Sequence, residues 1–142
     1  MKKIGEYTCR GQVPTNTTER IKLFDGRFDT AYKVTRFEVS PGDGTAAADV
    51  YGKLMTEDLG TGARAWNWQD NREIAWASGN QITTGIKELF DTIDPDNLIV
   101  EDLFVVVEDN NDGAVNYMIT MEKYDITDSQ GALAMVRNRS QA

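Results

Sequence analysis

Short runs of apolar residues, separated by clusters of turn-forming residues, dominate this chain. The clearest example is residues 97–127, where runs rich in Val, Ile, Phe and Tyr flank the cluster at residues 108–113. Asn, Asp and Gly tolerate the positive φ angles of tight turns, so this pattern predicts a hairpin of paired antiparallel strands. The runs cover residues 98–100, 103–107 and 114–121.

Similar runs earlier in the chain predict five more strands, at residues 4–13, 20–24, 30–40, 50–55 and 72–78. Pro14, Gly26 and Pro41 follow three of them, and such residues commonly end strands. Many short strands at close spacing are typical of an all-β domain. The pattern therefore predicts a mainly β fold, an antiparallel β-sandwich or a jelly-roll-like arrangement.

Two segments depart from this rhythm and predict short helices at residues 84–93 and 128–137. In the first, apolar residues recur at the i, i+3, i+4 and i+7 spacing of one helix face, at Ile86, Leu89, Phe90 and Ile93. Pro95 then prevents the helix from continuing. In the second, Ala132, Met135 and Val136 form the apolar side.

The length of 142 residues fits one domain that buries about two thirds of its unfolded surface. We therefore expect a single β-rich domain over residues 1–142, with a flexible C-terminal arm at residues 136–142. The lone Cys9 cannot form a disulfide within the chain. The start of the sequence is polar, and no apolar run approaches the roughly 20 residues of a membrane span, so neither a signal peptide nor a membrane segment is expected.

A formal net charge of −8 argues against sequence-independent binding of nucleic acid, which needs clustered Lys and Arg. The charge is unevenly distributed. Residues 1–40 hold 8 Lys and Arg against 5 Asp and Glu, whereas residues 41–142 hold 7 against 18. Blocks of opposite sign can steer copies of the chain onto each other or onto a charged partner, and ordinary solubility charge is the alternative explanation.

Residues that commonly carry catalysis are scarce. The sequence contains no His, so the usual proton shuttle and most metal-ligand sets are missing, and Cys9 has no His to activate it. No glycine-rich phosphate loop or nucleophile elbow occurs. Asp70 and Glu73 would suit a glycosidase carboxylate pair, but no pattern supports that role. We therefore expect neither an enzyme nor a cofactor.

The acidic cluster at residues 108–113 offers the hard oxygen ligands that Ca²⁺ prefers. It lacks the alternating spacing and the distant bidentate Glu of an EF-hand loop. Asn and Asp also suit a plain turn, because their side chains bond the local backbone. The sequence favours the plain turn, and we expect no metal site.

The three tryptophans are the first candidate interface residues. Trp66 and Trp68 stand two positions apart, so in an extended segment both side chains would project from one face, and Trp76 follows downstream. Such residues can pack in a core, anchor a protein interface or stack against sugar rings.

Arg137 and Arg139 are the second candidate interface residues. They lie in a C-terminal tail that contains no acidic residue, within an otherwise acidic part of the chain. The tail is either a frayed terminus or an arm that contacts an acidic neighbouring subunit.

In its overall style, and most of all in residues 117–133, the chain resembles small virion structural proteins of tailed bacteriophages, particularly those of marine and cyanobacterial hosts. The resemblance covers about a third of the chain and includes no catalytic motif. It implies a β-sandwich or jelly-roll subunit that coats, cements or projects from a capsid, often as a trimer. It also implies a virion location after assembly in the host cytoplasm.

The sequence thus favours a viral structural protein, a capsid decoration or cement subunit that forms a homo-oligomer, with a trimer expected, and binds the major capsid protein or another virion protein. Anchors of aromatic and aliphatic residues with an acidic rim would carry these contacts. The alternative is a carbohydrate-binding β-sandwich that uses Trp66, Trp68 or Trp76. Neither function requires nucleic acid or a membrane.

Overall fold

The computed structural model describes residues 2–24, 26, 29–43, 47–82 and 85–126. Its strands are β1 (Lys2–Pro14), β2 (Thr17–Ile21), β3 (Thr30–Pro41), β4 (Ala48–Met55), β5 (Glu73–Ile82), β6 (Gly85–Ile93), β7 (Leu103–Asp109) and β8 (Ala114–Asp125).

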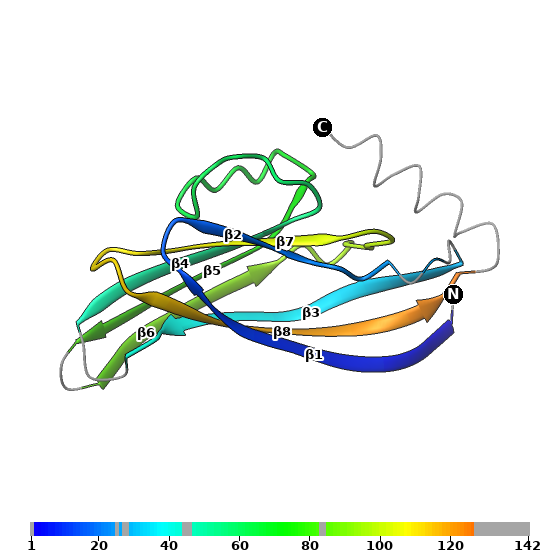
Figure 1. Cartoon of the computed structure of the whole chain (residues 1–142). Helices are drawn as coiled ribbons and strands as arrows, with labels where there is room; N and C mark the ends of the chain where they lie inside the picture. Colours follow the sequence, from blue (N-terminus) through cyan, green and yellow to red (C-terminus); the bar gives the residue numbers. More distant parts are fainter. Residues whose placement is uncertain (1, 25, 27–28, 44–46, 83–84, 127–142) are drawn as a thin grey trace.

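These strands form two antiparallel sheets that pack face to face (Figure 1). Sheet A has the strand order β1-β8-β3, and sheet B has the order β2-β7-β4-β5-β6. The predicted β-sandwich is therefore confirmed. The described part of the chain contains no helix long and apolar enough to cross a membrane.

The main core lies between the two sheets. Successive side chains of a strand point to opposite faces, so alternate apolar residues meet across the sandwich. Those exposed by 1% or less include Val34, Phe37, Ile119, Leu54 and Val105. Gly52 lets the two sheets approach closely, because a Cβ atom there would lie 2.5 Å from Val39 Cγ1.

Strands β7 and β8 do not form the predicted hairpin, because they lie in different sheets. Val105 and Val107 of β7 instead belong to the same buried cluster as Val115 and Ile119 of β8. The turn at residues 110–113 carries the chain from sheet B to sheet A, with Asp112 at a φ of 59°. Apolar alternation is the same whether two strands pair side by side or face each other across a core, so the pattern predicted the strands but not their pairing.

The turn after β1 makes the same crossing. Because β1 pairs with β8 and β2 pairs with β7, the two crossings are adjacent. Thr15 Oγ1 accepts a hydrogen bond from the Asp109 amide at 2.8 Å, and the Asn16 amide donates to the Val107 carbonyl at 2.9 Å. These bonds hold one end of the sandwich together.

The predicted helix at residues 84–93 is wrong, since Gly85–Ile93 form β6, an edge strand of sheet B. Leu89 lies opposite Gly79 of β5, and Phe90 lies opposite Ser78. Pairing with β6 satisfies backbone groups of β5 that would otherwise lack partners on that side, and this tertiary demand outweighs the helical spacing. The predicted helix at residues 128–137 lies outside the described residues, as does the arm at residues 136–142.

Two predicted extended segments also differ in detail. Strand β2 is Thr17–Ile21 rather than residues 20–24. Residues 98–100 are not a strand, although Ile99 forms an isolated antiparallel bridge with Tyr32 of β3. Next to it, the buried Asn97 side chain bonds both backbone groups of Val34, at 2.8 and 3.0 Å. This segment therefore covers part of the free edge of β3.

Candidate functional site

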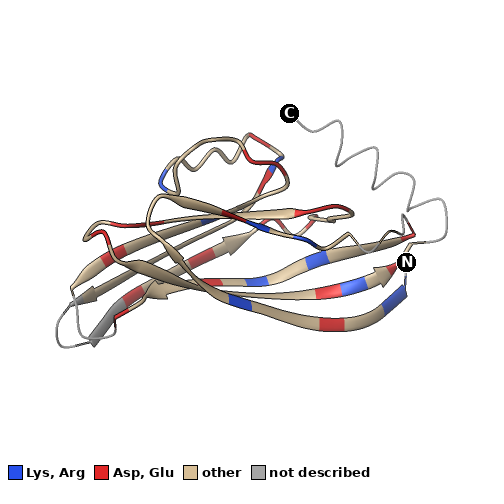
Figure 2. Ribbon diagram, viewed as in Figure 1, with Lys and Arg blue, Asp and Glu red and all other residues tan. Residues whose placement is uncertain are grey.

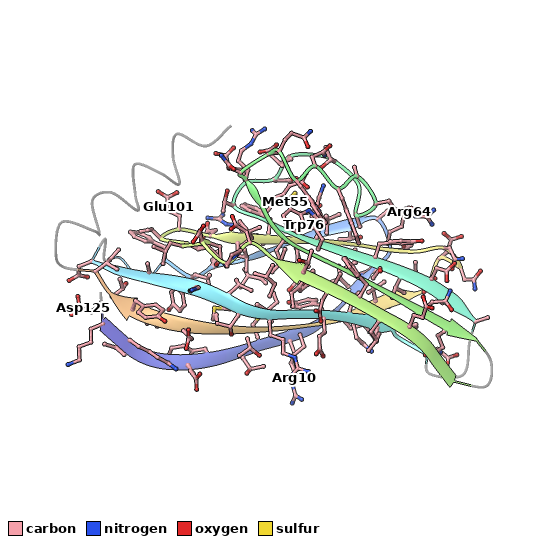
Figure 3. All side chains as sticks on the ribbon, turned by 180° about the vertical axis from the view of Figure 1, so that it is seen from behind. Arg10, Met55, Arg64, Trp76, Glu101 and Asp125 are labelled. Carbon is pink, nitrogen blue, oxygen red and sulfur yellow. The ribbon has the colours of Figure 1, made fainter. Side chains whose placement is uncertain are left out.

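A loop of residues 56–72 joins β4 to β5 and covers part of the outer face of sheet B (Figure 1). Met55, Ala63 and Val106 form a second apolar cluster there, each exposed by 4% or less. Figure 3 shows Met55 beneath the loop and Arg64 on it. Arg64 Nε lies 2.8 Å from Glu108 Oε2 on β7, so the loop is also tied to the sheet by an ion pair.

A buried cation anchors this loop from below. Lys53 Nζ projects from β4 and lies 3.2 Å from Glu73 Oε2, and neither side chain is exposed to solvent. The same ammonium group donates hydrogen bonds to Thr61 Oγ1 at 2.6 Å and to the Ala65 carbonyl at 2.8 Å. All three of its protons therefore have acceptors, as a buried ammonium group requires.

The carboxylate of Glu73 is equally well satisfied. Its Oε1 accepts hydrogen bonds from the Asn67 amide at 2.8 Å and from Trp76 Nε1 at 3.0 Å. Burial raises the pKa of Glu73, but the hydrogen bonds from Trp76 and Asn67 and the charge of Lys53 outweigh it and hold the pKa below its usual value. The loop is thus held by a charged, fully bonded group.

The three tryptophans lie on this side of the molecule, in different environments. Trp76 is 6% exposed, whereas Trp68 is 61% exposed and packs on it with ring centroids 5.6 Å apart and planes at 46°. Trp66 stacks instead on Phe90 of β6, at 5.7 Å and 19°. Trp66 and Trp68 belong to the loop rather than to a strand. Their side chains therefore pack on different partners and do not project together from one face.

A hollow of about 280 Å³ lies beside the exposed ring of Trp68. We call it the Trp68 pocket. Its lining includes Trp68, Trp76, Asp70, Asn71, Thr92 and Asp94. The loop and the end of β6 both contribute to it, so residues distant in sequence share one site.

A larger groove of about 660 Å³ is lined by residues of both sheets. We call it the edge groove. Its lining includes Leu89 of β6, Met118 of β8, Arg10 of β1 and Glu38 of β3. Leu89 is 61% exposed and Met118 39% exposed. Figure 3 shows Arg10 pointing away from sheet A.

Asp70 and Glu73, the candidate carboxylate pair, both have structural roles. Asp70 forms a two-point contact with Arg72, at 3.0 Å to Nε and 2.9 Å to NH2. This contact, together with the charge of Arg72, lowers the pKa of Asp70 against the opposing effect of burial. Neither carboxylate is placed to act as a general acid, because both are held in the ionised form.

The acidic turn at residues 108–113 uses its oxygens locally. Asp109 is 5% exposed, and its Oδ1 accepts the Asn111 amide at 2.8 Å. Asn110 Oδ1 accepts the Asp49 amide at 2.8 Å. Among the described residues, no group of three or more His, Cys, Asp or Glu side chains is arranged to hold a metal ion.

The basic residues of the N-terminal region do not form a separate basic face in the folded chain. Strands β1 and β3, from the basic N-terminal region, flank β8 in sheet A, and Lys3 lies 2.7 Å from Glu122 (Figure 2). The expected interface residues Arg137 and Arg139 lie outside the described residues.

No family model and no curated protein sequence matches this chain. The site must therefore be interpreted from its own chemistry. Sequence reasoning identified Trp68 and Trp76 but missed Lys53, Asp94 and the exposure of Leu89. A lone Lys within an apolar strand, between Gly52 and Leu54, was the one available signal for the buried ion pair.

Proposed function

We propose that this protein is a structural subunit of a virion, a capsid decoration or cement protein that acts through contacts with copies of itself and with the major capsid protein. The observation that supports this proposal best is the exposed apolar edge of β6, which adjoins the edge groove. Large apolar side chains grouped at an unpaired edge are features of association sites.

Strand β6 combines an unpaired edge with large exposed apolar side chains. Within the described strands, β6 pairs only with β5, and it exposes 61% of Leu89 and 46% of Phe90. Strand β3 is partly covered at Asn97 and Ile99. The β6 edge, next to the edge groove, is therefore the contact surface that we propose.

The partner at this edge is a second copy of the chain. A strand added to β6 would satisfy its free backbone groups, and the Leu89 and Met118 side chains would be buried in the same contact. Charged groups at the rim, Arg10 and Glu38, would fix its register. A ring of such contacts closes as a trimer if the β6 edge of each copy contacts a different surface of the next copy.

The test is the mass of the protein in solution, measured by light scattering. We expect a trimer for the natural sequence and a monomer for Leu89→Lys, because a charge at the edge cannot be buried unpaired. Ile4→Lys is the matched control, since Ile4 is 50% exposed on β1, and it should leave the trimer intact. A natural protein that stays monomeric at every concentration would contradict the proposal.

A further inference from the structure

We propose that the Trp68 pocket binds a single ring of a neutral sugar. This inference goes beyond the proposed subunit contacts, because it uses a different surface and a different class of ligand. It starts from the exposure of Trp68, whose large apolar ring is 61% accessible to solvent. An exposed indole ring has an unfavourable hydration cost that a stacked ligand removes.

The ring of Trp68 is held in place from behind. Trp76, 6% exposed, packs against it at 5.6 Å, and Trp76 is itself fixed by its hydrogen bond to the buried Glu73 at 3.0 Å. The Lys53–Glu73 pair therefore serves the pocket as well as the loop. A flat apolar face supported in this way loses little conformational entropy when a ligand stacks on it.

Hydrogen-bonding groups lie in the same hollow as this face. Thr92 contributes a hydroxyl group, and Asp94 contributes a carboxylate. Asp94 Oδ1 accepts the Asp96 amide at 3.0 Å, and no hydrogen bond within the described residues engages Oδ2. Pyranose rings combine an apolar C–H face with a rim of hydroxyl donors, so the ring stacks on Trp68 while a hydroxyl group donates to Asp94.

The size and the charge of the pocket limit which ligands it can bind. A volume of about 280 Å³ is just below the roughly 300–1,000 Å³ of pockets for drug-sized ligands, which suits one ring rather than an enclosed chain. Among its charged lining residues, Asp70 pairs with Arg72 and Glu73 pairs with Lys53, whereas Asp94 has no cationic partner in the described chain. The net charge of the pocket lining is therefore negative, which favours the binding of neutral sugars over sialic or uronic acids.

A positively charged side chain is the competing ligand, because aromatic rings beside carboxylates also bind cations. A cation cage needs several open ring faces around one charge. Trp76 is almost fully buried, so only Trp68 offers an open face. One supported face next to hydroxyl and carboxylate groups fits a sugar better.

The experiment is a titration of the full-length protein with glucose, galactose, mannose and N-acetylglucosamine, monitored by tryptophan fluorescence and by backbone amide shifts in NMR spectra. Glucuronate, sialic acid and methylguanidinium are the charged comparison ligands. We expect at least one neutral sugar to bind with a dissociation constant of about 1 mM and to shift residues 68–71 and 92–94.

Variants connect the binding to the pocket. Trp68→Ala should weaken binding at least tenfold, Trp68→Phe should weaken it less, and Asp94→Asn should weaken it several-fold. Trp66→Ala is the matched control, because Trp66 stacks on Phe90 and does not line the pocket, and it should bind normally. Unchanged melting temperatures would confirm that the variants are folded.

Three results would overturn the inference: no neutral sugar binds, the acidic sugars bind equally well, or methylguanidinium alone binds in a Trp68-dependent manner. None of these results bears on assembly, because the trimer is predicted to depend on Leu89. Trp68→Ala should therefore leave the mass in solution unchanged, and Leu89→Lys should leave sugar binding unchanged.

Discussion

At the scale of single residues, the buried pair of Lys53 and Glu73 has the largest consequences. Removing two charges from water is costly, and their attraction offsets this cost only when every remaining donor and acceptor is bonded. Besides Trp76 of β5, the groups that complete the bonding belong to the loop over sheet B and are Thr61, Ala65 and Asn67. The pair therefore couples the order of that loop to the sheet and to Trp76.

The stability of the protein should fall far more when one member of the pair is replaced than when both are replaced. Glu73→Gln retains an acceptor for Trp76 and Asn67 but leaves Lys53 buried without a counterion, so we expect a loss of roughly 3–5 kcal/mol in the free energy of unfolding. Lys53→Met combined with Glu73→Gln should recover much of this loss. Urea denaturation measures both values, and a double variant no more stable than Glu73→Gln alone would show that charge is not the cause.

The lowered pKa of Glu73 predicts how stability depends on pH. The unfolded carboxyl has its ordinary pKa of 4.5, and the folded one has a lower pKa, so acid favours the unfolded state. The contribution is complete above about pH 4.5 and is lost as pH falls toward the folded pKa. Denaturation curves at decreasing pH should show this loss, and the Lys53→Met, Glu73→Gln variant should show less of it.

At the scale of elements, β6 shows how an edge strand differs from a buried strand. Leu89 and Leu54 are the same residue type on strands of one sheet, but Leu89 is 61% exposed and Leu54 is not exposed. We expect Leu89→Ala to cost below about 1 kcal/mol and Leu54→Ala to cost roughly 2–5 kcal/mol, because only the second leaves a cavity. A comparable loss at both positions under conditions where the protein is monomeric would mean that β6 is covered within one chain.

In the turn between β7 and β8, the acidic and amide side chains stabilise the local backbone. Side-chain oxygens of Asp109 and Asn110 already accept hydrogen bonds from backbone amides. We therefore expect no preformed calcium site in this turn. We expect the melting temperature to be the same with calcium and with a chelator. A clear increase with calcium, abolished by Asp109→Asn with Asp112→Asn, would establish a metal site there.

At the scale of the whole molecule, we expect the distribution of charge to affect the proposed assembly more than the folding. Sheet A interleaves the basic N-terminal strands with β8, while most acidic residues lie on sheet B and its loops (Figure 2). Arg137 and Arg139 are the only charges after Asp128, so we propose them as the basic groups of the tail that pair with an acidic neighbouring subunit.

Deleting residues 136–142 should therefore leave the thermal stability of the monomer nearly unchanged and weaken the trimer, most strongly at low salt. Light scattering of full-length and truncated protein at two salt concentrations measures this effect. Ser140→Ala is the control, since it changes the tail without changing its charge. Identical masses for the truncated and full-length forms at both salt concentrations would identify the tail as a frayed end.

The sequence by itself determined the fold class and the positions of most strands. Alternation of apolar and polar residues with a period of two is a local property, and turn residues such as Pro14 and Pro41 mark strand ends wherever the strands finally lie. For the same reason, the sequence identified Trp68 and Trp76 as candidates and showed the scarcity of catalytic residues. Each of these conclusions depends only on residue type and spacing.

The tertiary structure alone decided which strands pair and which residues share a site. The patterns of β7 and β8 suit a hairpin and a crossing between sheets equally well, and the 86–93 pattern suits a helix until β5 requires a partner. The Trp68 pocket joins a loop to the end of β6, and the Lys53–Glu73 pair spans 20 positions. Such contacts depend on backbone hydrogen bonds and burial across the whole chain, which no local pattern contains.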